Sequence, residues 1–488
     1  MTVKKQAIGA VAAGHRVTAR AAAEILLQGG NAFDAAIAAL LTACVCEPVL
    51  ASLGGGGFMM ARTADGPVRL VDFFCDTPMR KQPADAVEFV EVFADFGTLR
   101  QPFHIGCGAT ATPGMIPGLV TIARQLGTMP LADLAAPAVN AARDGVAVTP
   151  FQAFLFEVVS PILTWTADAR ALFAPDGGLL KTGDRLVNHD LAEALAALGT
   201  GDHGAIFRTM AEAMDPERSH LTGDDICAYE PVIRDPIGIE RDNARVLLNP
   251  RPALGGALVA AMLDAVEGPH GEACARAMAQ TDRLWRESGA DAVWPDKGGA
   301  RHGGRSHRGT THVSVIDASG NAVAATVSNG EGHGRIVPNC GFMMNNMLGE
   351  EDVNPDGFHN WTPGRRLSSM MTPAIVETGD GALQALGSGG SNRIRTAIFQ
   401  VLVNRLIGGL GPQQAVTAPR MHFEKGRLDI ECAGERSDTE QLCTAFPDHV
   451  RWPDRSLYFG GVHLVERRAD GTFGGAGDDR REGVFLAV

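Results

Sequence analysis

Thr310 and Thr311 open a segment, 310–328, in which polar and apolar residues alternate as in a β-hairpin. A threonine hydroxyl is a weak nucleophile unless a base lies beside it. If the chain is cut between Gly309 and Thr310, the new α-amine can be that base, because its pKa is roughly 7.7–8.0. The pattern therefore indicates an N-terminal threonine nucleophile, although β propensity alone also explains two threonines at the start of a strand.

The segment before this hairpin has the composition of a linker. Residues 296–309, DKGGARHGGRSHRG, hold five glycines among fourteen residues, and most of the others are charged or polar. A bond that must be cut has to lie in an accessible stretch, so the linker fits a cleavage junction at its end. A solvated surface loop is the simpler alternative.

The surrounding elements are expected to segregate rather than alternate. Periodicity predicts a helix over 17–30, a nearly all-apolar buried helix over 31–48, and a strand at 50–63 that pairs with 68–78. From 118 to about 215 the pattern is mainly helical. Beyond 310 it is mainly β, with further strand and turn signals at 340–349 and a helix at 392–409. This arrangement predicts an α+β fold.

Composition excludes several classes of function. A formal charge of −13 with only two tyrosines argues against nucleic acid or an anionic membrane as a partner. The longest strongly apolar run, 35–46, is too short to span a bilayer.

The nine cysteines show no metal-ligand spacing, and Cys44 and Cys46 are typical of buried thiols, so we expect a reducing, cytoplasmic setting. The spacing of five between His302, His307 and His312 is not a usual metal-binding pattern, so we expect no bound metal. We expect no cofactor either.

Over nearly its whole length the chain resembles the γ-glutamyltranspeptidase (glutathione hydrolase) family. The matching motifs, in the family's order, are AAGHRVTARAAAEILLQGGNAFDAAIA, GGGGFMM, ATPGMIPGL, TTHVSVIDASGNAVAAT, NN at 345–346, RRLSSMMTP, GSGG and YFGGVH. The resemblance implies a four-layer αββα N-terminal-nucleophile hydrolase sandwich. It also implies a precursor that cuts itself between Gly309 and Thr310. A large segment, 1–309, and a small one, 310–488, would form one composite fold jointly and stay associated, and assembly into homo-oligomers is left open.

The resemblance also implies catalytic roles. Thr310 matches the nucleophile, and Ser328 matches a hydroxyl residue that hydrogen-bonds and tunes it. Gly389 and Gly390 match the pair whose N–H groups form the oxyanion hole, where a Cβ would obstruct the developing charge.

Substrate-binding roles are implied as well. Ser368 and Ser369 match a pair that holds the substrate α-carboxylate. Asn329 matches a substrate-binding asparagine across a loop about two residues longer than the family's. Glu350 matches the acid that pairs with the α-amine, in a register left open between Glu350, Glu351 and Asp352.

One departure concerns the substrate. The family carries an arginine in a D-F-R-E pattern that grips the glutamyl α-carboxylate, whereas this chain reads Asp72-Phe73-Phe74-Cys75. A phenyl ring cannot replace a charged fork, and the loss removes roughly 1.5–3 kcal/mol of binding. The cations that could replace it from another direction are Arg335, Arg365, Arg366, Arg393 and Arg395.

We therefore predict an autoprocessed amide hydrolase that cleaves a γ-glutamyl or similar small acyl group from a small-molecule substrate. Transfer of that acyl group to an acceptor amine is left open. The first alternative is an acylase or amidohydrolase with a non-glutamyl substrate on the same scaffold. The second is an unprocessed, non-catalytic binding protein.

Overall fold

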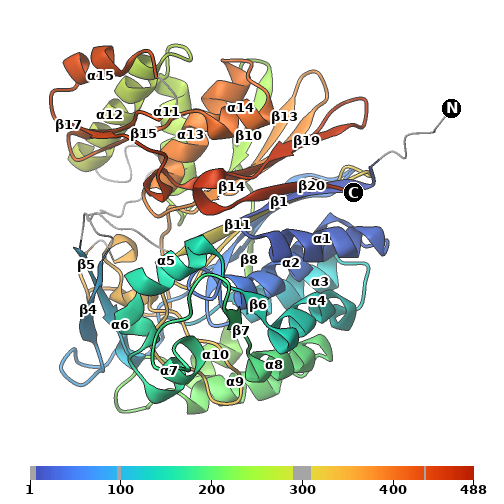
Figure 1. Cartoon of the computed structure of the whole chain (residues 1–488), viewed down its shortest axis with the longest axis vertical. Helices are drawn as coiled ribbons and strands as arrows, with labels where there is room; N and C mark the ends of the chain where they lie inside the picture. Colours follow the sequence, from blue (N-terminus) through green and yellow to red (C-terminus); the bar gives the residue numbers. More distant parts are fainter. Residues whose placement is uncertain (1–6, 96–99, 289–308, 355, 434–435) are drawn as a thin grey trace.

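Two antiparallel sheets face each other at the centre of the molecule (Figure 1). The computed structural model describes residues 7–95, 100–288, 309–354, 356–433 and 436–488, so the predicted linker lies outside the described residues except for Gly309. The first sheet has seven strands, in the order β20 (Val484–Ala487), β1 (Gly9–Ala13), β11 (Thr310–Asp317), β12 (Ala322–Ser328), β2 (Gly56–Arg62), β3 (Val68–Phe73) and β8 (Val232–Arg234). The second has six, in the order β19 (Phe473–Ala476), β18 (Gly461–Arg467), β14 (Leu383–Gly389), β13 (Ala374–Thr378), β10 (Ala244–Leu248) and β9 (Ile237–Arg241).

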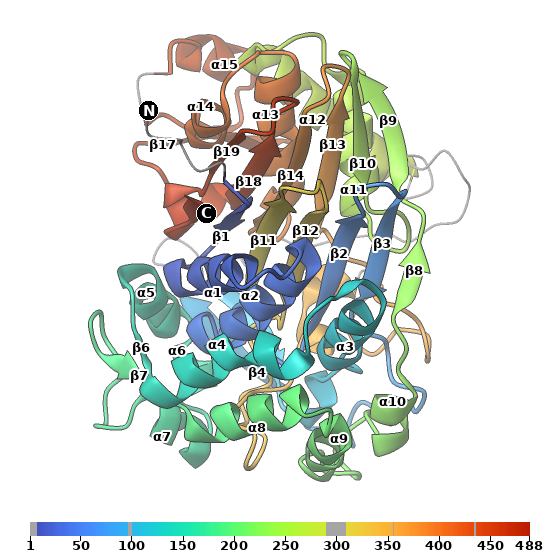
Figure 2. The same cartoon turned by 90° about the vertical axis from the view of Figure 1, so that its right-hand side faces the viewer.

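Helices cover the outer face of each sheet (Figures 1 and 2). The first sheet is covered by α1 (Arg16–Leu27), α2 (Ala32–Cys46) and α3 (Met115–Leu126), while α4 (Leu131–Asp144) packs on α2 and α8 (His189–Gly199) packs on α4. On the second side lie α11 (Gly255–Ala265), α12 (Gly271–Ser288), α13 (Arg393–Leu406), α14 (Pro412–Thr417) and α15 (Thr439–Ala445). The predicted α+β fold with αββα layers is confirmed.

Both sheets combine strands from either side of residue 309. The first takes β1, β2, β3 and β8 from before it and β11, β12 and β20 from after it. The second takes β9 and β10 from before it and its other four strands from after it. Neither part of the chain could complete either sheet alone.

Successive side chains of β11 and β12 alternate between the two faces of the first sheet. Val313 and Val315 pack with the helices α1 and α2, whereas Ile316 and Ala324 pack between the two sheets. Successive strand residues point to opposite faces. Thr310 therefore faces the second sheet, and Thr311 faces α2.

The helix predictions at the N-terminal end are confirmed. The Asn31 side chain accepts the N–H groups of Phe33 and Asp34 and so caps α2, in which every residue is buried. Cys44 and Cys46 lie inside this helix, and burial raises the pKa of both thiols well above the ordinary value.

The region 340–349 differs from its prediction. It forms isolated bridges, Ile336 with Met343 and Gly54 with Met344, and a single 3₁₀ turn rather than strands. The Asn345 amide donates to the carbonyls of Gly54 and Ala111, so a side chain replaces a strand partner there.

The remaining elements lie at the periphery: α5 (Pro150–Val158), α6 (Ser160–Leu163), α7 (Ala167–Phe173), α9 (His203–Glu212), α10 (Gly223–Ala228), β4 (Val90–Asp95), β5 (Arg100–Ile105), β6 (Val146–Ala147), β7 (Arg185–Leu186), β15 (Met421–Glu424), β16 (Arg427–Glu431) and β17 (His449–Trp452). Among the described residues, no helix combines the length and apolar character needed to cross a bilayer.

Candidate active site

Thr310 begins β11 and pairs across the sheet with Ser328, the last residue of β12. Both side chains line a small cavity of about 30 Å³. Glu350 and Ser369 line the same cavity. The fold thus brings four predicted site residues together from three separate segments of the chain.

The carbonyl group before Thr310 is already engaged. The Ser328 hydroxyl donates a hydrogen bond of 2.6 Å to the Gly309 carbonyl oxygen, and the Gly330 N–H donates to Ser328 Oγ at 3.1 Å. A hydrogen bond to a carbonyl oxygen withdraws electrons from its carbon, which favours attack by a nucleophile. In the uncut chain Ser328 therefore acts on Gly309, whereas the sequence predicted that it hydrogen-bonds the nucleophile.

The predicted oxyanion glycines lie against Thr310 from the second sheet. A Cβ on Gly389 would be 2.2 Å from the Thr310 carbonyl oxygen, and Gly390 has φ +125°, which favours glycine. The Arg481 guanidinium lies within 3.3 Å of both Cβ positions. Burial, together with the nearby charge of Arg393, lowers the pKa of Arg481 to about 10, so Arg481 remains charged at neutral pH beside the glycine pair.

The rest of the cavity wall is apolar on one side and acidic on the other. Its apolar residues are Phe74, Met347, Val353, Met370, Met371 and Ile394. Glu350 and Asp352 both line the cavity, while Glu351 is exposed, so two of the three candidate acids share the cavity with Thr310. Asp352 accepts a hydrogen bond of 2.9 Å from the Ser391 hydroxyl.

Two predicted substrate-binding residues do not line this cavity. Asn329 is fully buried, and neither atom of its amide has a hydrogen-bond partner within the described part of the chain. Ser368 lies next to Ser369 but outside the lining.

Phe74 occupies the wall where the family arginine would be expected. It is 1% exposed, stacks on Phe58 with ring centroids 5.4 Å apart, and lines the cavity. Among the described residues, the lining of the cavity includes no lysine or arginine that could pair with a substrate carboxylate.

The five candidate replacement arginines are elsewhere. Arg335 pairs with Glu88 at 2.7 Å, Arg366 with Asp72 at 2.8 Å, and Arg395 with Glu424 at 3.5 Å. Arg393 donates to the Tyr458 carbonyl and lies over its ring, and Arg365 is exposed.

A buried carboxylate next to Thr311 was missed by the sequence reasoning. Glu47 follows α2 and accepts hydrogen bonds from the hydroxyls of Thr18, at 2.9 Å, and Thr311, at 2.7 Å. Burial raises the pKa of Glu47 to about 7, while both threonine hydroxyls and Arg481 act in the opposite direction. An acid at the end of the apolar run CVCEP was the available signal.

Glu47→Gln is expected to become relatively more stabilising as pH rises. The folded-state pKa of about 7 exceeds the ordinary 4.5, so the stability contributed by protonated Glu47 is complete below pH 4.5 and is lost as pH rises through 7. The variant should gain on the order of 1–3 kcal/mol over the parent between pH 5 and pH 8. Thermal unfolding of uncut Thr310→Ala protein, with and without Glu47→Gln, measures this. An equal difference at both pH values would show that Glu47 does not titrate in this range.

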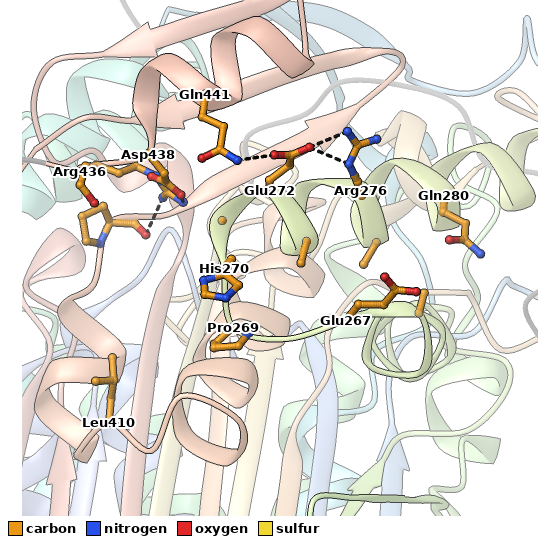
Figure 3. A pocket seen from close by; sticks show the side chains of 16 residues that line it. Glu267, Pro269, His270, Glu272, Arg276, Gln280, Leu410, Arg436, Asp438 and Gln441 are labelled. Carbon is orange, nitrogen blue, oxygen red and sulfur yellow. Dashed lines mark hydrogen bonds and ion pairs between the residues drawn. The ribbon is translucent and has the colours of Figure 1, made fainter.

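Other parts of the described structure offer no competing centre. Within the described residues, no three side chains that commonly bind metals are grouped together. A much larger hollow of about 1020 Å³ lies between α12, α15 and the loops beside them (Figure 3). Four of its charged residues form two pairs, Glu272 with Arg276 and Arg436 with Asp438, and its lining includes none of the predicted site residues.

This arrangement, two facing antiparallel sheets between layers of helices, is the fold of the N-terminal-nucleophile hydrolases. The model of the gamma-glutamyltranspeptidase family matches residues 18–287 and 274–488, and the chain belongs to that family. Acylase ACY 1 proenzyme of Pseudomonas sp. (strain V22) is 29% identical, over 98% of this chain and 93% of its own. Glutathione hydrolase proenzyme of Escherichia coli (strain K12) is 28% identical, over 97% and 90%. Cephalosporin acylase from Bacillus halodurans shares the fold, with a TM-score of 0.82 at 23% identity over 99% of this chain and 96% of its own.

Proposed function

We propose that the protein is an autoprocessed amide hydrolase in which Thr310 is the nucleophile, both for its own cleavage and for catalysis. The observation that carries the proposal is the 2.6 Å hydrogen bond from the Ser328 hydroxyl to the Gly309 carbonyl, directly before Thr310. The relatives named as proenzymes support it. The products are segments 1–309 and 310–488.

The cut is an acyl shift followed by hydrolysis. Thr310 Oγ attacks the Gly309 carbonyl carbon, the C–N bond breaks, and the hydroxyl proton passes to the departing nitrogen, which becomes the α-amine of Thr310. Water then hydrolyses the ester, so that Gly309 gains a carboxyl group and Thr310 recovers its hydroxyl. Because both sheets combine strands of the two segments, the products stay associated.

The freed terminus repeats this chemistry on a substrate. The α-amine of Thr310 takes the hydroxyl proton, Oγ attacks the amide carbonyl, and the leaving amine receives the proton. Gly389 and Gly390 supply the N–H groups for the oxyanion, next to the positive charge of Arg481. Water releases the acyl group from Thr310.

For the acyl group, the cavity favours an acylase over a γ-glutamyl hydrolase. Six of the twelve described residues that line it are apolar and none of the twelve is a cation, which suits an apolar acyl chain better than one that ends in an α-carboxylate. Glu350 and Ser369 favour the second candidate, γ-glutamyl, because they match the family's contacts with that group. The names of the relatives include both activities, acylase and glutathione hydrolase.

We propose hydrolysis as the main reaction, and transfer to an acceptor amine as a secondary one. We also place the protein in the cytoplasm, since all nine cysteines are free, as expected in a reducing compartment.

Purified protein is expected to separate on a denaturing gel into chains of about 32 and about 19 kDa, in proportion to the two segments of the 51.3-kDa chain. N-terminal sequencing of the smaller chain should read Thr-Thr-His. A single full-length chain that persists would instead support the non-catalytic binding protein. A smaller chain with another first residue would reject the proposed junction.

A further inference from the structure

A buried carboxylate holds the residue before the proposed cut. Glu331 is 3% exposed, and its Oε1 accepts a hydrogen bond of 3.0 Å from the N–H of Gly309. The sequence reasoning assigned no role to Glu331. Its contact is with the peptide group on the far side of Gly309 from Thr310.

Glu331 and Ser328 together hydrogen-bond both backbone polar groups of Gly309. The carboxylate holds its N–H and the Ser328 hydroxyl holds its carbonyl. A Cβ on Gly309 would lie 2.4 Å from the Val49 carbonyl oxygen and 2.5 Å from that of Gly330, so only glycine fits. These contacts restrict both backbone torsions of Gly309, and hence the direction in which its carbonyl carbon faces.

Glu331 is itself held in place. Its N–H donates to the Asn346 side-chain oxygen at 2.9 Å. The loop bends sharply at Gly330 and Gly332, which have φ of +65° and +97°. A group fixed before the reaction costs no ordering when the carbonyl is attacked.

We propose that Glu331 is a positioning residue for self-cleavage, which orients the Gly309 carbonyl toward Thr310 Oγ through the Gly309 N–H. The proposal rests on the proposed cut between Gly309 and Thr310. The geometry of the carboxylate promotes the reaction, whereas its negative charge opposes the oxyanion that forms nearby. An uncharged acceptor of the same shape should therefore serve as well.

Glu331 acts on the precursor and not on the mature enzyme. After the cut, Gly309 ends in a carboxylate, whose charge repels that of Glu331. The Gly309–Thr310 peptide bond that Glu331 oriented no longer exists. Loss of Glu331 should thus slow processing without changing turnover by molecules that have been cut.

The experiment follows the processing of freshly purified precursor on denaturing gels, for the parent, Glu331→Gln and Glu331→Ala. The alanine variant should process at least about 10-fold more slowly, because the orientation is lost. The glutamine variant should stay within about threefold of the parent, because Oε1 still accepts the Gly309 N–H. The processed fraction of each should show the parent's kcat/KM on an acyl anilide.

Glu88→Gln is the matched control. Glu88 is another buried glutamate, and it binds the same loop through Arg335 without contact to Gly309. Glu88→Gln should leave processing within about threefold, as expected when the ion pairs of Glu88 with Arg335 and Arg218 are weakened. Equal slowing by Glu88→Gln and Glu331→Ala would overturn the proposal, because loosening of the loop would then explain both.

Parent-like processing of Glu331→Ala would also overturn it, as would an equal loss of processing and kcat/KM. These failures leave the cut itself intact. Processing by Thr310→Ala, or a smaller chain that does not begin at Thr310, would instead reject the cut on which the proposal depends.

Discussion

Thr310→Ala is expected to leave the protein as one chain of 51.3 kDa, without measurable hydrolysis of an amide substrate. Alanine has no hydroxyl to attack the Gly309 carbonyl, so neither the acyl shift nor the free α-amine can form. Removal of the nucleophile in a hydrolase that uses a covalent intermediate reduces kcat by about 10³-fold or more. Gel analysis over several days, with an anilide assay on the same samples, measures both effects.

Thr310→Ser is the matched control for this loss. Serine keeps the hydroxyl and removes only a methyl group from a site 4% exposed, so processing should continue, within about 10-fold of the parent rate. Complete processing and activity of Thr310→Ala would reject the nucleophile. Failure of both variants to process, with retained folding, would indicate that the threonine methyl group is needed for orientation.

The second large effect concerns the acyl group. The protein should hydrolyse an anilide of an apolar acyl group at least about 10-fold better, in kcat/KM, than the γ-glutamyl anilide. The reason is that none of the described residues lining the cavity is a cation that could replace the lost contact of about 1.5–3 kcal/mol. Phe74→Arg places such a cation at the wall and should shift the ratio toward γ-glutamyl by about 10- to 150-fold. A glutaryl anilide separates the effect of the carboxylate from that of the amine.

Phe74→Leu controls for the loss of the ring, since it leaves the wall apolar and should not favour γ-glutamyl. Processing of each variant reports that the fold is intact, because the cut occurs within the same cavity. Equal turnover of the two anilides by the parent would reject the acylase proposal. An unchanged ratio in Phe74→Arg would show that residue 74 does not contact the α-carboxylate.

The local elements could be predicted from the sequence because their signals are local. The alternation over 310–328 specifies the hairpin, and the observed register pairs Thr310 with Ser328. The apolar run at 31–48 predicts a buried helix, and α2 is fully buried. The motif order, matched to the family, also predicted roles for Thr310, Ser328 and the glycine pair 389–390. In the structure, Ser328 and the glycine pair lie next to Thr310.

The register after the hairpin could not be predicted in the same way. The acids of GEED differ by one position each, and only the 3₁₀ turns Met347–Gly349 and Glu351–Val353 decide that Glu350 and Asp352 face the cavity. Likewise, each candidate arginine has the same charge in the sequence. Which of them is free depends on carboxylates far along the chain, such as Asp72 for Arg366.

The sequence by itself determined the family, through the order of its motifs, and with it the layered fold that the family implies. It also predicted Thr310 as the nucleophile, because motifs and periodicity act over short stretches. Tertiary structure decided what surrounds that residue. Glu331 reaches Gly309 only because the backbone turns at Gly330, and Glu47 reaches Thr311 only because α2 ends beneath β11. Contacts between distant segments depend on how the two sheets pack together, and the spacing of residues along the chain does not contain that information.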